Sequence, residues 1–111
     1  MKHRVFQVPI WSVSLHIYVG KDPVAARVKA KDLFDEWDEE DRFEALASWN
    51  GSEFGLFFSP RPSLELVAHE VFHITHRILE RAEANFDPEH HEQGAYLMGW
   101  LMDVVWRATR G

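Results

Sequence analysis

The sequence predicts one α+β domain over residues 1–111, and three observations support this. Between Trp11 and Val19, apolar and polar residues alternate strictly, which is the period of a half-buried strand. Over residues 63–84 and 89–107, apolar residues recur every three or four positions, which is the period of a helix. Finally, 111 residues with 46% hydrophobic side chains suffice for one core, and no linker or repeat divides them. Strands that precede helices in this order are typical of the α+β class.

The amino-terminal third is expected to contain a strand and a helix. Residues 11–19 form the predicted strand, and Gly20 ends it. Pro9 interrupts the pattern before it, so residues 5–8 are either a separate edge segment or a bend. Asp22 followed by Pro23 is a helix-start signal, because it combines a capping side chain with proline at the first helical position. This helix is expected over residues 23–37, with Val24, Val28, Leu33, Phe34 and Trp37 available for packing.

The middle of the chain predicts a hairpin. Residues 43–49 and the apolar run from Phe54 to Phe58 are its two strands, and Asn50-Gly51 supplies the turn. The acidic run over residues 35–41 is interpreted as a solvated helix end and turn.

Two helices are expected to complete the domain. The first covers residues 63–84 and is broken by Asn-Phe-Asp-Pro at 85–88, and the second covers residues 89–107. The core stripe of the first contains Leu64, Val67, Val71, Ile74 and Ile78. The core residues of the second are Ala95, Leu97, Leu101, Val104 and Val105.

Composition excludes several classes of protein. Twelve Lys and Arg against 18 Asp and Glu give a net charge of −6, which argues against a nucleic-acid-binding module. The absence of Cys excludes disulfide scaffolds, Cys-ligated zinc fingers and thiol catalysis. No apolar run approaches the roughly 18 residues of a membrane span, and the start lacks the apolar stretch of a signal peptide. We therefore expect a cytoplasmic protein without a membrane partner, in which seven His are the unusual feature.

The motif His69-Glu70-Val71-Phe72-His73 gives those histidines a chemical role. Residues four apart lie about 40° apart around a helix, so both imidazoles can reach one zinc ion. The intervening Glu70 lies beside the metal, where its carboxylate can accept a proton from zinc-bound water. At roughly 100° per residue, His69 and His73 point away from the core stripe. The sequence therefore predicts a catalytic zinc site on this helix.

Such a site needs a third protein ligand. The metzincin pattern is excluded, because His76 and Leu79 stand where it requires Gly and His. A carboxylate from the following helix is the other solution, and Glu92 is the best candidate because a helical hairpin can return it to the His pair. His91 stays open as an alternative, and Asp87, Glu89 and His90 are weaker rivals.

Two further residues share the predicted site. His76 lies on the same helix face as His69, where it forms part of a cleft wall or is a plain surface residue. Tyr96 shares one face of the last helix with Glu92 and Gly99, and its hydroxyl could polarise a substrate carbonyl or lie at the rim. His3 and His16 have no partner that can be read from the sequence.

The segments 68–73, 78–81 and 95–101, together with Glu92 and the opening residues 6–11, resemble small phage-encoded zinc metallopeptidases of the zincin superfamily, on its gluzincin side. The resemblance implies a minimal zincin-like domain, with a small, mostly antiparallel sheet packed on the active-site helix. It also implies that His69, His73 and Glu92 bind zinc and that Glu70 is the general base. The strand from Phe54 to Phe58 would be the sheet edge along which an extended peptide lies.

These patterns predict a zinc-dependent metallopeptidase, which would act in the host cytoplasm if it is encoded by a phage. The alternative is a small interaction or inhibitor protein whose zinc site is structural or vestigial. Substitution of Glu70 by Gln separates the two hypotheses, because it removes the base and leaves the ligands in place. The sequence does not indicate the oligomeric state.

Overall fold

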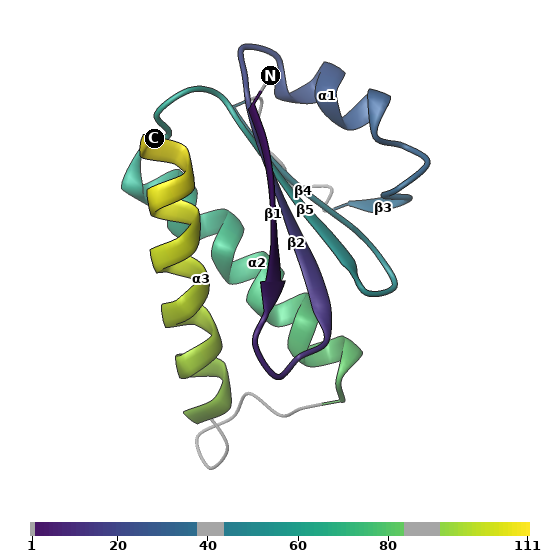
Figure 1. The fold of residues 1–111 in the computed structure, drawn as a ribbon, viewed down its shortest axis with the longest axis vertical. Coiled ribbons are helices and arrows are strands. Elements are labelled where there is room, and N and C mark those ends of the chain that lie inside the picture. The colour runs from purple at the N-terminus through teal and green to yellow at the C-terminus, as the bar shows by residue number, and fades with distance from the viewer. Residues whose placement is uncertain (1, 38–43, 84–91) are drawn as a thin grey trace.

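Five strands form one mixed sheet in the computed structural model, which describes residues 2–37, 44–83 and 92–111 (Figure 1). The strand order is β1-β2-β5-β4-β3. The pairs β1–β2, β4–β5 and β3–β4 are antiparallel, and β2–β5 is parallel. The mostly antiparallel sheet expected of an α+β domain is thereby confirmed. The strands are β1 (Lys2–Val8), β2 (Val13–Val19), β3 (Glu36–Trp37), β4 (Ala45–Asn50) and β5 (Glu53–Phe58).

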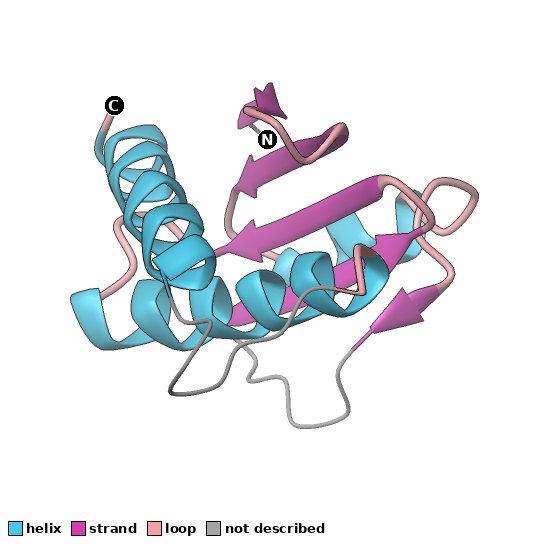
Figure 2. Cartoon of the chain, turned by 90° about the horizontal axis from the view of Figure 1, so that it is seen from below, coloured by secondary structure: helices cyan, strands magenta, loops and turns pink. Residues whose placement is uncertain are grey.

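The helices cover both faces of this sheet. Helices α2 (Leu64–Arg81) and α3 (Glu92–Arg110) lie on one side, and the short α1 (Pro23–Lys29) lies on the other (Figures 1 and 2). Because side chains alternate along a strand, the interior strands β2, β5 and β4 contribute to two cores. Leu15, Ile17 and Leu56 pack under α2 and α3, whereas Leu46 and Phe57 pack with Phe34 on the α1 side.

Helix α1 begins as the sequence predicts. Asp22 is its N-cap, its carboxylate accepts a hydrogen bond of 3.0 Å from the Ala25 N–H, and Pro23 occupies the first turn. The expected extension to residue 37 is wrong, because the helix ends at Lys29 and residues 36–37 form β3. Val24 and Val28 are 37% and 60% exposed, so they form no apolar stripe that could hold a longer helix against the sheet.

Residues 5–8, for which an edge segment and a bend were the alternatives, belong to an edge strand. Residues 2–8 form an edge strand, and residues 9–12 form the turn to β2, so the second strand begins at Val13 and not at residue 11. This turn contains two positive φ angles at residues with side chains, 61° at Ile10 and 53° at Ser12. Pro9 therefore lies in a turn between two paired strands.

The hairpin and the two long helices are present as expected, although α2 ends at residue 81 and not at 84, and α3 continues to residue 110 and not to 107. Asn50 and Glu53 flank a tight turn in which Gly51 has φ 58°. Helix α2 is capped by Ser63, whose hydroxyl accepts from the Leu66 N–H at 3.2 Å, and ends at Arg81. Two expected core residues are wrong, because Leu64 is 60% exposed and Ala95 is also exposed. No helix within the described ranges is long and apolar enough to cross a membrane.

Candidate metal centre

The two histidines of the motif lie side by side on α2 with converging ring nitrogens. His69 Nε2 and His73 Nε2 are 3.2 Å apart, and the ring centroids are 4.7 Å apart with the planes at 76°. Two nitrogens that bind one tetrahedral zinc at about 2.0–2.1 Å are separated by about 3.3 Å. The pair therefore has the spacing of two ligands to one ion.

The other close histidine pair has a different geometry. His3 Nε2 and His16 Nδ1 are 3.1 Å apart, but their ring centroids are 5.3 Å apart and the planes differ by 20°. The centroids are thus 2.2 Å farther apart than the nitrogens, against 1.5 Å for His69 and His73. A large difference means that the rings face each other nearly head-on, as in an N–H···N hydrogen bond. The nitrogens of His69 and His73 also lie at hydrogen-bond distance from each other, so the geometry gives the spacing of two ligands and not the direction of their lone pairs.

Glu70 completes this group from the buried side of α2. It is fully buried, and its Oε2 lies 3.7 Å from His69 Nε2. Val67, Val71, Ile74 and Ile78 are buried on the core face and fix the rotation of the helix about its axis. That rotation leaves the His69 side chain 29% exposed at the boundary between core and solvent. The structure thus brings His69, Glu70 and His73 together as the motif predicts.

His76 belongs to a separate surface pair. Its Nε2 lies 3.7 Å from Glu80 Oε2, and both side chains are more than half exposed. Glu80 also accepts from Arg77 Nη1 at 3.3 Å, and the Arg77 guanidinium lies over the Trp49 ring of β4 at 4.5 Å from its centroid. Of the two interpretations, His76 matches the plain surface residue, and Glu80 is its partner.

Glu92 forms no metal-binding group with the His pair among the residues that the structure describes. It is exposed in the first turn of α3. Helix α3 runs back along α2, because Arg110 at its end donates to the Pro62 carbonyl just before α2. In the part of the chain that is described, no three His, Cys, Asp or Glu residues form a metal-binding group. The candidates Asp87, Glu89, His90 and His91 lie outside the described residues.

Tyr96 lies in a pocket on another part of the surface. Its side chain is 76% exposed and lines a cavity of about 270 Å³ between α3 and the β1–β2 turn. The other lining residues are Val8, Pro9, Ile10, Trp11, Leu97 and Trp100, and none of them belongs to the His pair. A role of Tyr96 at the metal stays a prediction from the sequence.

The expected substrate edge is corrected by the sheet order. Strand β5 contains Phe54 to Phe58 and pairs with β2 on one side and with β4 on the other. Its backbone is therefore not open to an added strand, although its apolar side chains mark it correctly as a strand. A run buried on both faces is typical of a central strand, and Phe54, Leu56, Phe57 and Phe58 are all buried.

A polar array on the α1 side of the sheet was not predicted from the sequence. Glu53 Oε2 accepts from His16 Nε2 at 3.1 Å, which leaves His16 Nδ1 to accept from His3. Burial, and then the neighbouring His16, lowers the pKa of His3. The alternation in β2 assigns His16 to the face opposite Leu15. His3 and Glu53 lie next to His16 because of the register of the β1–β2 and β2–β5 pairings. The residue pattern of a single strand contains no information on that register.

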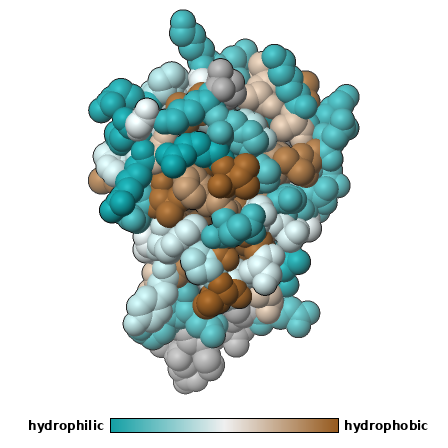
Figure 3. Space-filling view, viewed as in Figure 1, coloured by the Kyte–Doolittle hydropathy of each residue, from teal (hydrophilic) through white to brown (hydrophobic). Residues whose placement is uncertain are grey.

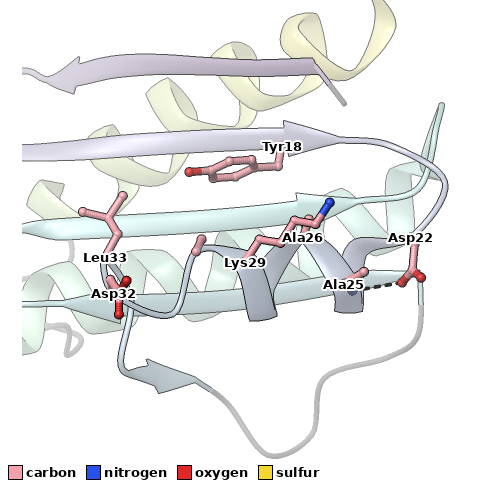
Figure 4. A pocket seen from close by; sticks show the side chains of 8 residues that line it. Tyr18, Asp22, Ala25, Ala26, Lys29, Asp32 and Leu33 are labelled. Atoms are coloured by element: carbon pink, nitrogen blue, oxygen red, sulfur yellow. Dashed lines mark hydrogen bonds between the residues drawn. The ribbon is translucent and has the colours of Figure 1, made fainter.

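A larger pocket adjoins this array. It has a volume of about 450 Å³ and lies between Tyr18 and helix α1 (Figure 4). The Tyr18 ring stacks between His3 and Phe57, with centroid distances of 4.0 Å and 4.6 Å. Burial, and then the Glu53 carboxylate, raises the pKa of Tyr18, so its hydroxyl stays a hydrogen-bond donor.

No protein-family model, curated protein or solved structure matches the chain.

Proposed function

We propose that the protein is a zinc-dependent hydrolase that cleaves peptide bonds. One observation carries the proposal: His69 Nε2 and His73 Nε2 converge at 3.2 Å, and a buried carboxylate oxygen of Glu70 lies 3.7 Å from His69 Nε2. Two nitrogen donors at chelating distance suit zinc, and an adjacent carboxylate suits proton transfer.

His69 and His73 would hold the ion, with Glu92 or His91 as the third protein ligand. When bound, zinc acts as a Lewis acid and lowers the pKa of a bound water to about 7. Glu70 is placed to take a proton during attack on the carbonyl and to return it to the leaving amine. Its position in the buried layer of α2 keeps the carboxylate fixed, since its backbone cannot rotate without displacing Val67 and Val71 from the core.

The zinc site is tested by metal analysis of purified protein. We expect about one zinc per chain in the wild type, and its loss in His69→Ala and in His73→Ala. His76→Ala is the matched control, because it removes an imidazole from the same helix without touching the pair. Zinc content well below one per chain and equal in all four proteins contradicts the site.

Catalysis needs a separate test on a mixture of unstructured peptides. Glu70→Gln is expected to keep zinc and to lower the rate of cleavage by roughly 10²–10⁴, the usual contribution of a general base. Glu65→Gln, an exposed position on the same helix, is expected to keep full activity. A zinc-loaded wild type without cleavage products contradicts a peptidase and favours the interaction protein with a structural zinc site. Loss of zinc in Glu92→Ala would identify the third ligand.

A further inference from the structure

Strand β1 is an edge strand of the sheet. It has seven residues, pairs with β2 on one side, and has no strand on its other side among the described residues. Lys2, His3, Arg4 and Val5 are exposed, and Val5 is an apolar side chain with 48% exposure. In Figure 1, β1 lies in front of the other strands, and the same view in Figure 3 shows brown apolar atoms among teal polar ones. The opposite edge strand, β3, has two residues within the described part of the chain.

A regular exposed edge is a template for pairing with another chain. The usual protection is a charge on the edge that meets a like charge when two copies pair. Strand β1 contains two cations, Lys2 and Arg4, so the register of a pairing decides whether they repel.

Only one antiparallel register pairs all seven residues of β1 with the same seven residues of a second copy. It places a twofold axis at Val5, which then faces Val5 of the second copy. In this register no cation lies directly opposite a cation, because the remaining opposed pairs are Lys2 with Val8, His3 with Gln7, and Arg4 with Phe6. The two Arg4 side chains are diagonal neighbours across the axis.

The individual pairs favour association. Two half-exposed Val5 side chains cover each other, and cross-strand pairs of this kind contribute roughly 0.2–1 kcal/mol each. Arg4 already lies over Phe6 of its own strand, 5.1 Å from the ring centroid, so an aromatic partner for this guanidinium is available on either strand. The Gln7 side chain is bound to β2, since its Nε2 donates to Ser14 Oγ at 3.0 Å.

We propose that two copies of this chain associate through β1 in that register. The dimer has a continuous sheet of two five-stranded halves and an isologous interface. This inference is independent of the proposed zinc chemistry, because β1 contributes no residue to the pair on α2.

The test is the mass of the full chain in sedimentation equilibrium over a concentration series. The wild type is expected to approach twice its mass of 13.0 kDa. Val5→Lys places two cations opposite each other across the axis and is expected to raise the dissociation constant about tenfold or more. Val28→Lys is the matched control, because it makes the same change at a valine on α1 that is 60% exposed. It is expected to dimerise like the wild type.

A charge-pair experiment identifies the axis. Val5→Glu alone is expected to be as weak a dimer as Val5→Lys, and an equimolar mixture of the two is expected to recover dimers, because opposite charges then meet. Circular dichroism verifies that each variant is folded. A wild type that stays monomeric at millimolar concentration overturns the proposal. It is also overturned by a Val5→Lys protein that dimerises as the wild type does, or by a mixture that shows no recovery. Association with added extended peptides but not with itself identifies the edge as a peptide-binding site and overturns the dimer.

Discussion

Gly55 lies beneath the ring of Phe34, and replacing it with alanine tests the packing on the α1 side. An added Cβ would lie 2.8 Å from Phe34 Cζ and 2.9 Å from Cε2, which is closer than carbon atoms approach in folded proteins. The ring cannot move freely, because Phe34 is 2% exposed and meets His16, Tyr18 and Phe57 edge-on. The Gly55→Ala variant must therefore displace this ring or the strand.

The expected cost follows from two opposing effects. Overpacking of a core by one methyl group typically costs about 1–3 kcal/mol. Replacing Gly by Ala also reduces the entropy of the unfolded chain, which stabilises the folded state by about 0.4–1 kcal/mol. We therefore expect Gly55→Ala to lower the free energy of unfolding by about 1–2 kcal/mol. At roughly 4–8 °C for each kcal/mol in a domain of this size, Tm falls by about 4–16 °C.

Urea and thermal denaturation followed by circular dichroism measure the change. Gly99→Ala is the matched control, because a Cβ there meets nothing within 4 Å and the position is in the exposed part of α3. It is expected to stabilise the protein by up to about 1 kcal/mol. Phe34→Leu should partly relieve Gly55→Ala, so that the double variant is less destabilised than the sum of the single variants. Wild-type stability of Gly55→Ala, or strict additivity with Phe34→Leu, would refute the packing argument.

Three other predictions concern pH, a helix cap and a turn. Because the pKa of His3 is lowered from 6.5 in the fold, the unfolded chain takes up the proton first, so stability is retained above pH 6.5 and declines as the pH falls below it. Urea denaturation between pH 5 and pH 8 should show this decline, and His3→Gln should flatten it; an equal slope in both proteins contradicts the assignment. Ser63→Ala removes the cap of α2 and is expected to cost about 1 kcal/mol by the same method, and an unchanged midpoint would show that the cap contributes nothing. Ile10→Gly is expected to raise the free energy of unfolding by about 1 kcal/mol, because a β-branched residue is strained at φ 61° and this side chain, which is 92% exposed, contributes little packing; a lower Tm would mean that its contacts outweigh the strain.

The predictable parts of this protein are those fixed by local sequence. The apolar stripe of α2 determines its rotation, and the four-residue spacing of His69 and His73 follows from helix geometry alone. The hairpin of β4 and β5 likewise follows from two short apolar runs around Asn50-Gly51.

The features that sequence reasoning missed depend on contacts between distant segments. Helix α1 ends early because residues 36–37 pair with β4 and Phe34 enters a space that Gly55 leaves open, neither of which a helical pattern reveals. The central place of β5 depends on its parallel pairing with β2, so an apolar run could be recognised as a strand but not as an interior one. The array of His3, His16 and Glu53 requires the register of three strands at once.

The parallel pairing of β2 with β5 also determines how the chain must fold. The hairpin β1–β2 and the hairpin β4–β5 each close over a short turn, so both can form from neighbouring residues. Their junction pairs Ser14 with Glu53 and Val19 with Phe58, 39 positions apart, and each such contact requires closure of a long loop. The sheet thus consists of two local hairpins, and the β2–β5 pairing between them, the seam, is expected to form last. We expect folding to be limited by the docking of these hairpins, so that substitutions at the seam slow folding more than substitutions within either hairpin.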